Sequence, residues 1–309
     1  MRNMTLWVGL SITLLMVAIG LFGPQWAPYE ADYRLELDYF INEKGEPDMI
    51  APPLPPGSPH LLGTDWDGYD ILTIILYGAK YTVFLSLGIA FVRVFVGGAL
   101  GMALGYFGRS PVERKGTTGV LGMLNGIPLF LIAYFILFRS SFNNYASPVF
   151  LSLVMAVILI LVGLPSVTTT VMDKTRELKR RPYILASQSL GAGHWRMIRT
   201  HISLHLRESF LVLFVNEVIM VLTIFGQLAI FNIFVGGTIH SLGLSGTDYI
   251  SRTNEWSGLI GEARYSMNSF QWMFWSPLTF YSTLIVGCYL VSKGLESYYK
   301  QKYSRYSHV

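Results

Sequence analysis

Two full charges, Arg93 and Glu217, stand inside long apolar stretches of this sequence. A charged side chain at membrane depth is costly unless it faces a partner, a cavity or water. The two residues therefore have a functional interpretation, as polar groups on a translocation path, and structural ones, as a buried ion pair or an arginine that reaches a headgroup. Asn125, close to Pro128, marks another apolar stretch, whose helix is expected to bend where it lines a cavity, meets a partner or is kinked by the proline.

The sequence offers little catalytic or metal-binding chemistry. The phosphate-binding pattern G-x-x-x-x-G-K-S/T does not occur, so any ATP that drives this protein must bind another chain. His201 and His205 stand four residues apart, but zinc needs a third ligand that their neighbourhood does not offer. The single cysteine, Cys288, excludes an intrachain disulfide. We therefore expect no catalytic residue, no metal site and no cofactor on this chain.

The composition places these residues in a membrane protein. Of 309 residues, 52% are hydrophobic and only 14% are charged, and the mean hydropathy is +0.44. Soluble domains carry about 25% charged residues. The net charge of +4 is better explained by membrane topology than by a phosphate-binding face, so the expected partner is the lipid bilayer and not a nucleic acid.

Six apolar stretches are long enough to cross a bilayer, which takes roughly 20 helical residues. They cover residues 4–22, 81–106, 117–138, 148–165, 209–235 and 270–291. The first is expected to stay in the mature protein, because no small-x-small cleavage pattern follows it. The sequence therefore predicts an all-α membrane protein with six transmembrane helices.

The distribution of basic residues predicts the orientation. With the N-terminus inside, 16 of the 23 Lys and Arg residues fall on the inner segments and six on the outer ones. Acidic residues show the opposite bias, since ten of the 19 lie between Glu30 and Asp70, on the outer side. An excess of Lys and Arg marks the cytoplasmic side, so both termini are predicted to be cytoplasmic.

Two long connections divide the chain. The outer one, 24–80, is acidic and then rich in proline, and we expect an extended chain with little core, acting as a solvated spacer or as a contact for another protein. The inner one, about 166–208, is basic and should contain short helices at 183–190 and 194–206. Gly97, Gly101 and Gly105, four residues apart, leave one helix face bare, so that a neighbouring helix can pack closely.

The first short helix of the inner connection ends in an unusually smooth tip. Residues 183–193 read Y-I-L-A-S-Q-S-L-G-A-G, with small side chains on one face and a glycine stop. Such a tip suits docking into a groove on another protein. The alternative is an amphipathic helix that rests on lipid headgroups, which Lys179, Arg180 and Arg181 would favour.

Three separated motifs resemble the permease subunits of binding-protein-dependent ABC importers, in particular the second ("C") permease of the oligopeptide/dipeptide/nickel branch. Residues 62–70, L-G-T-D-W-D-G-Y-D, are similar to the family's L-G-T-D-x-x-G-R-D. The inner helix is similar to the EAA motif, whose A-A-x-x-x-G core falls on Ala186, Ser187 and Gly191, with Tyr183 ahead. Residues 256–264 are similar to W-G-x-M-L-x-x-G-R.

The resemblance implies a type I ABC importer permease fold in the cell (inner) membrane of a bacterium or archaeon. It implies a homologous second permease, two cytoplasmic ATPases that bind ATP and Mg, and an extracytoplasmic substrate-binding protein that delivers a peptide or similar small solute. Tyr183, Ala186, Ser187 and Gly191 would then couple this chain to an ATPase. The implied parts are a first transmembrane helix (1–23), an outer segment (24–80), a transmembrane domain of five helices with the EAA-like loop (81–292) and a cytoplasmic tail (293–309).

Three positions depart from the family pattern. Tyr69 replaces an arginine, Pro182 stands where an acidic residue usually opens the EAA motif, and Ser203-Leu204 replaces a closing Leu-Pro. Loss of that proline removes a fixed bend after the coupling helix. Two alternatives therefore stay open, an ion-coupled secondary transporter that uses Arg93 and Glu217, and a non-transporting membrane scaffold or sensor built on a permease fold.

Overall fold

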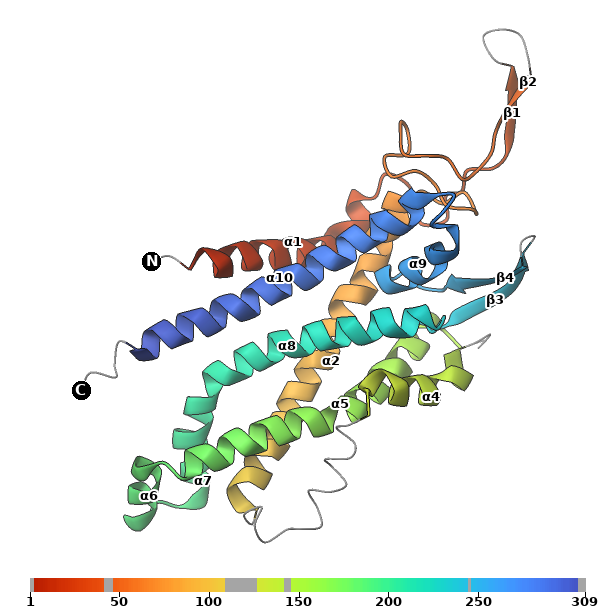
Figure 1. Ribbon diagram of the computed structural model, residues 1–309. Coiled ribbons are helices and arrows are strands. Elements are labelled where there is room, and N and C mark those ends of the chain that lie inside the picture. The colour runs from red at the N-terminus through yellow and green to blue at the C-terminus, as the bar shows by residue number, and fades with distance from the viewer. Residues whose placement is uncertain (1–2, 42–46, 109–126, 142–145, 244–245, 305–309) are drawn as a thin grey trace.

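The computed structural model describes residues 3–41, 47–108, 127–141, 146–243 and 246–304, and this part of the chain is mostly helical (Figure 1). The long helices are α1 (Met4–Trp26), α2 (Ile71–Phe107), α5 (Pro148–Lys179), α8 (Ser203–Ile230) and α10 (Gln271–Ser304). The shorter ones are α4 (Leu129–Ser141), α6 (Pro182–Ser189), α7 (His194–Arg196) and α9 (Trp256–Ala263). A π-helical turn, Met197–Ile202, joins α7 to α8, and a 3₁₀ turn, Arg264–Ser266, follows α9.

Five of the described helices are long and apolar enough to cross a membrane. The prediction of an all-α membrane protein is therefore confirmed. The expected span at 117–138 lies partly outside the described residues, and its described end forms α4. The count of six spans and the sidedness of the termini stay predictions.

Helix α2 is the central element of the bundle. It packs against α5, α1 and α8, while α10 lies against α1, α8 and α9 (Figure 1). The main core lies around α2 and includes Ile75, Val83, Leu159, Leu222 and Phe225. A spanning helix in this position contacts protein on several sides. A charged residue on it, such as Arg93, can therefore face other helices and avoid the lipid.

The glycine stripe of α2 faces α5. A Cβ atom added at Gly97 would lie 2.9 Å from a methyl carbon of Val167, and one added at Gly101 would lie 2.7 Å from the Thr168 carbonyl oxygen. At Gly105 the nearest atom is the Met172 carbonyl oxygen, also at 2.7 Å. These distances leave no room for a side chain, so the three glycines allow the backbones of α2 and α5 to approach each other.

The helices extend beyond the predicted membrane spans. Helix α5 continues past Pro165 to Lys179, and helical structure runs from His194 through the π-helical turn into α8. The inner connection is therefore largely built from the ends of spanning helices. A hydropathy pattern shows where a helix lies in the membrane and does not show where the helix ends. A prediction from hydropathy therefore assigns a polar helix end outside the bilayer to a loop.

The outer segment is more structured than the sequence led us to expect. Within it, an antiparallel hairpin pairs β1 (Asp38–Ile41) with β2 (Pro47–Ile50). A second hairpin, between α8 and α9, pairs β3 (Thr238–Gly243) with β4 (Gly246–Ser251). The expectation of an extended, coreless chain was wrong for residues 54–70 as well, because His60, Thr64 and Asp70 there are buried. Side-chain and backbone hydrogen bonds order this stretch, and hydropathy does not detect them.

Candidate functional site

The structure brings Arg93 and Glu217 together in the middle of the bundle. The Arg93 Nη1 atom lies 3.1 Å from the Glu217 Oε2 atom, and the arginine side chain is fully buried. Its Nε and Nη2 atoms donate to the Leu159 carbonyl oxygen at 3.0 and 2.6 Å. One guanidinium thus joins α2, α5 and α8.

Gly163, one turn after Leu159 on α5, makes room for this guanidinium. A Cβ atom added there would overlap the Arg93 side chain. Gly163 was not among the residues predicted for this site, although a glycine within an apolar span is a general sign of close packing. Its effect is to let the planar, always charged guanidinium lie directly against the α5 backbone.

A second polar contact lies next to the ion pair. The Ser292 hydroxyl of α10 donates to the Asn216 side-chain oxygen of α8 at 2.7 Å, and Ser292 is buried. Asn216 precedes Glu217 in the chain, so four helices contribute polar groups at this level. Asn125, the third residue predicted for this site, lies outside the described residues. The arrangement holds helices together by charge and hydrogen bonding.

At the opposite end from the hairpins, α6 presents a short exposed tip (Figure 1). Gly191 follows the helix with φ of +82°, and the Ala192 N–H donates to the Ser187 carbonyl oxygen at 3.1 Å. This bond from the third residue beyond the helix end to its last turn is a Schellman motif, which requires a left-handed residue such as glycine. A Cβ atom at Gly191 would meet open space, and Leu190 is 89% exposed.

The other predicted coupling residues also lie on α6. Ala186 is exposed, and the Ser187 hydroxyl donates to the Tyr183 carbonyl oxygen at 2.9 Å. The Tyr183 ring stacks on His205 at a centroid distance of 5.3 Å. All four predicted coupling residues thus belong to one short element, with Tyr183 at its anchored end and Gly191 at its tip.

The inner face of α6 is anchored. Ile184 is fully buried, together with Met197 and Ile202 of the π-helical turn, in a cluster that includes Tyr106 of α2 and Val167 of α5. The tip therefore stands on a packed base. Where the family's proline would bend the chain after the coupling helix, the π-helical turn joins α7 to α8 without a break.

Polar contacts also connect the packed cluster beneath α6 to the end of α2. The Tyr106 hydroxyl lies 3.0 Å from the His194 Nδ1 atom, at the start of α7. The Lys179 ammonium donates to the Tyr106 carbonyl oxygen at 2.6 Å and lies 5.1 Å from the centre of the Tyr106 ring. These contacts join the EAA-like loop directly to the end of α2.

Zinc binding is not favoured at the two neighbouring histidines. The His205 Nδ1 atom is 2.7 Å from the His201 carbonyl oxygen, a contact within one helical turn. Within the described ranges, no group of three His, Cys, Asp or Glu side chains could hold a metal ion. His205 instead packs against Tyr183 as part of the loop.

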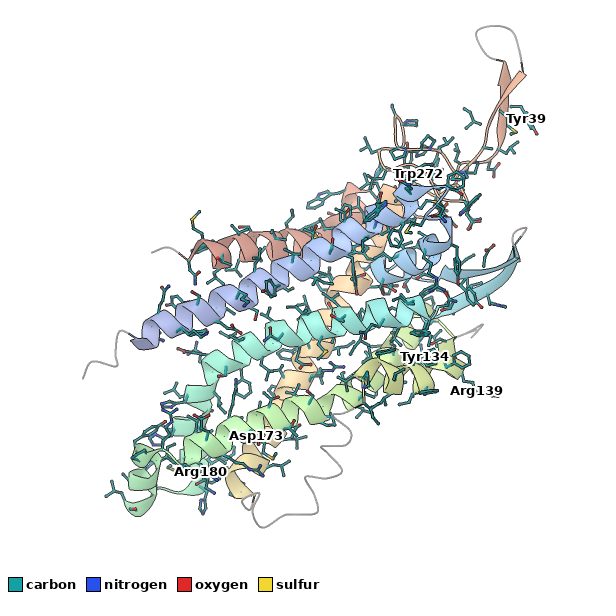
Figure 2. The ribbon with its side chains drawn as sticks, viewed as in Figure 1. Tyr39, Tyr134, Arg139, Asp173, Arg180 and Trp272 are labelled. Carbon is teal, nitrogen blue, oxygen red and sulfur yellow. The ribbon has the colours of Figure 1, made fainter. Side chains whose placement is uncertain are left out.

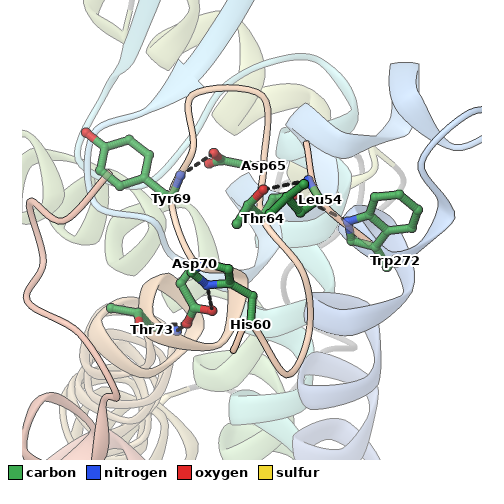
Figure 3. A network of polar contacts seen from close by, with 8 residues as sticks. All are labelled: Leu54, His60, Thr64, Asp65, Tyr69, Asp70, Thr73 and Trp272. Carbon is green, nitrogen blue, oxygen red and sulfur yellow. Dashed lines mark hydrogen bonds and ion pairs between the residues drawn. The ribbon is translucent and has the colours of Figure 1, made fainter. Parts of the chain in front are cut away.

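The first family motif, 62–70, begins α2 at its outer end (Figure 3). The Asp70 carboxylate accepts from the Thr73 N–H at 2.8 Å and the Thr73 hydroxyl at 2.7 Å, and its other oxygen lies 3.1 Å from the His60 Nδ1 atom. Trp272 of α10 donates to the Thr64 carbonyl oxygen at 3.2 Å. The motif thus caps α2 and fastens it to α10.

Asp65 shapes the turn within this motif. One of its carboxylate oxygens accepts from the Tyr69 N–H group at 2.8 Å (Figure 3) and from the Asp67 N–H group at 3.0 Å. Burial raises the pKa of Asp65 to about 7, while its hydrogen bond from the Tyr69 backbone opposes that shift. The turn is therefore sensitive to proton concentration near neutrality.

Tyr69, which replaces the family's arginine, still contacts a guanidinium. Arg34 lies over the Tyr69 ring, with its central carbon 4.4 Å from the ring centre, and donates to the Tyr69 hydroxyl. The positive charge that the family's arginine would supply at position 69 therefore comes from Arg34, in the segment before β1. Cation–π contacts of this kind stabilise by about 0.5–1 kcal/mol at exposed sites.

The third motif, 256–264, packs against the same half of α2. Trp256 is fully buried, its indole donates to the Ile75 carbonyl oxygen at 2.9 Å, and its backbone N–H donates to the Thr82 hydroxyl at 3.0 Å. Glu255 caps α9 by accepting from the Ser257 N–H at 2.8 Å. Burial raises the pKa of Glu255, and its hydrogen bonds from Ser257 oppose the shift. This motif positions α2 and carries no catalytic arrangement.

Comparison with known proteins agrees with this arrangement. Residues 97–302 match the family described as "Binding-protein-dependent transport system inner membrane component". A glutathione transport system permease protein from Pectobacterium atrosepticum is 26% identical over 82% of this chain and 72% of its own length. A dipeptide transport system permease protein from Haemophilus influenzae is 24% identical over 93% and 87%, and an oligopeptide transport system permease protein from Bacillus subtilis is 23% identical over 93% and 82%.

The match covers two thirds of the chain and includes the end of α2 from Gly97 onward, the EAA-like loop and most of α10. The resemblance inferred from the three motifs is confirmed, and so is the location in a membrane. This chain belongs to the family of binding-protein-dependent transport system inner membrane components, the permease subunits of ABC importers.

Proposed function

We propose that this chain forms, with a homologous second permease, the translocation path of an ATP-driven importer for peptides or a similar small solute. The observation that carries the proposal is the α6 tip, which is exposed and smooth at Gly191 yet fixed on a packed base. The names of the relatives, which refer to glutathione, dipeptides and oligopeptides, support a small peptide-like solute.

The proposed coupling works through Tyr183, Ala186, Ser187 and Gly191. The exposed part of α6 enters a groove on a cytoplasmic ATPase, and ATP and Mg bind there and not on this chain. Tyr183, stacked on His205, orients the helix, and Gly191 adds no side chain at its tip. A rigid tip is needed because a flexible one would absorb the movement that it should transmit.

The movement reaches the membrane through α2. Tyr106 contacts the loop at the inner end of α2, and Arg93 lies on the same helix at the level of the polar contacts. We propose that the ion pair holds α2, α5 and α8 together beside the solute path. A helix that spans both places is a direct mechanical link between ATPase closure and the pore.

The test is reconstitution from native cells. The tagged chain is purified in mild detergent with its partners and placed in proteoliposomes, and uptake of a labelled dipeptide, tripeptide and glutathione is measured with and without enclosed ATP. ATP-dependent uptake that requires a second permease, two ATPases and a binding protein is expected. Uptake by this chain alone, driven by an ion gradient, would replace the importer by a secondary transporter.

A further inference from the structure

The β1–β2 hairpin stands apart from the helical bundle, beyond the outer end of α2 (Figure 1). Among the described residues its two strands pair with each other and with no further strand, with Tyr39 opposite Met49 and Asp38 opposite Ile50. A two-stranded hairpin is marginally stable in water unless something packs against it. The hairpin is therefore a candidate for an element that is completed by another molecule.

One face of this hairpin carries exposed apolar side chains. Tyr39 is 71% exposed and Met49 is 50% exposed, and directly opposite residues of an antiparallel pair share one face. Leu37, two residues before Tyr39 and 50% exposed, continues that face by strand alternation. Figure 2 shows the Tyr39 side chain on the hairpin, away from the helices. Contiguous exposed apolar side chains mark interaction surfaces, and tyrosine is enriched among the residues that dominate binding.

The surrounding charge is strongly acidic. Residues 30–50 contain seven acidic and two basic residues, a net charge of −5 in a chain whose total is +4. Glu30, Asp32 and Glu36 in this stretch are exposed. Acidic clusters attract a basic surface and are repelled by anionic lipid headgroups. The charge therefore favours a basic, water-soluble protein over the membrane surface as the occupant.

The base of the hairpin is fastened to the outer end of α2. The Leu35 N–H donates to the Gly68 carbonyl oxygen at 2.8 Å, and Arg34 contacts Tyr69. Gly68 and Tyr69 belong to the turn that leads into Asp70, the cap of α2. A molecule bound to the hairpin therefore pulls on the same helix that the EAA-like loop contacts at its inner end.

We propose that the β1–β2 hairpin docks the extracytoplasmic binding protein, through an apolar spot ringed by Lys or Arg on that protein. The inference rests on the proposed function, since it assigns a place on this chain to one of the partners. Burial of Leu37 and Tyr39 in the contact stabilises the complex, and the acidic residues increase the rate of association by long-range electrostatic attraction.

Photo-crosslinking in native cells tests this surface. A benzophenone amino acid replaces Tyr39, and a matched variant carries it at Leu61, which is also exposed at the outer end but lies outside the hairpin. The expected adduct forms at position 39 and not at position 61, with a soluble extracytoplasmic protein. An adduct with lipid or with another membrane subunit, or no adduct at 39, overturns the inference.

Charge reversal makes the test quantitative. The soluble protein identified in the adduct is purified separately. The purified complex in zwitterionic nanodiscs is then titrated with it at low and high salt. Glu36→Lys is expected to weaken binding about tenfold at low salt and less at high salt. Glu177→Lys makes the same charge change on α5, at the inner end, and should leave affinity unchanged. Equal affinities of the unchanged complex, the Glu36→Lys variant and the Glu177→Lys variant for the soluble protein overturn the inference.

The proposed function is measured separately in the same preparation. ATP-dependent uptake without an adduct at position 39 removes the hairpin assignment and leaves the importer in place. A soluble adduct at position 39 in a complex that never takes up solute with ATP supports the docking surface and removes the importer.

Discussion

Arg93 and Glu217 form an ion pair of 3.1 Å between helices whose paired residues are 124 positions apart in sequence. The guanidinium also satisfies the Leu159 carbonyl oxygen, so α5 takes part in the contact. Removing one partner of a buried pair leaves an uncompensated charge and costs about 3–5 kcal/mol, whereas removing both is far less damaging. The pair is therefore best tested by a double-mutant cycle.

Arg93→Met and Glu217→Gln should each lower the unfolding free energy in detergent more than the double variant does. Urea-induced unfolding followed by tryptophan fluorescence measures the change. Arg93→Lys is the matched control, because it keeps the charge but replaces the planar fork by a point charge. Losses that simply add in the double variant would mean that the two residues act at separate sites.

Gly163 should tolerate a side chain poorly, because the three atoms nearest to an added Cβ atom all belong to the Arg93 guanidinium group. Gly163→Ala places a methyl group on the Arg93 guanidinium, which must move away from Leu159, and we expect a loss of about 1–3 kcal/mol in stability. Gly88→Ala on α2 meets open space and serves as the control. A difference in melting temperature between the two variants measures the effect, and equal melting temperatures would contradict it.

The Tyr106–His194 contact should affect coupling more than stability. Tyr106→Phe removes one hydroxyl from a buried residue, and the ring contacts with the loop remain. We expect ATP hydrolysis by the reconstituted complex to continue while solute taken up per ATP falls. His194→Gln keeps a polar partner at the same place and is expected to retain part of the transport. An unchanged ratio in Tyr106→Phe would remove this contact from the coupling route.

Gly191 tests the α6 tip itself. Gly191→Asp adds a charge where the proposed ATPase groove would lie, so uptake should be lost while the protein stays in the membrane. Gly191→Asn is the matched control, because asparagine has a similar volume, carries no charge and tolerates the left-handed backbone at φ of +82°. Normal uptake by Gly191→Asp would remove the tip from the coupling assignment.

Much of the helical fold could be predicted from the sequence, because burial in lipid demands long apolar runs. Hydropathy located the spans of α1, α2, α5, α8 and α10. It missed how far α5 and α8 continue outside the membrane, where polar residues are equally stable in a helix. Helix α6 was predicted within one residue of Pro182–Ser189, because Gly191 marks the stop of the helix.

The site was only partly accessible to sequence reasoning. Arg93 and Glu217 stood out because full charges are rare in apolar runs, but their partner on α5 is a backbone carbonyl of Leu159, which any residue would supply. Asn216 and Ser292 are ordinary polar residues until the fold places them in contact. Neither hairpin was predicted, since strands of four to six residues give too short a pattern.

Asp65 should make the outer end of α2 sensitive to pH. The pKa of this carboxyl group is about 7 in the folded protein, against 3.8 for the free side chain. The folded protein therefore holds a proton that the unfolded chain releases between these values, so this residue's contribution to stability is full below pH 3.8 and is lost as the pH rises to 7. Hydrogen exchange of the Asp67 and Tyr69 amides across this window measures the loss.

Asp65→Asn separates the charge from the hydrogen bonds. The asparagine oxygen can still accept from the Asp67 and Tyr69 N–H groups, but the side chain cannot ionise, so protection of these amides against opening should no longer fall with pH. Asp32→Asn removes the same charge from an exposed residue and should leave the pH dependence as it is. If Asp65→Asn keeps the original pH dependence, the proton is held elsewhere, and Glu262, whose pKa burial also raises, becomes the group to replace.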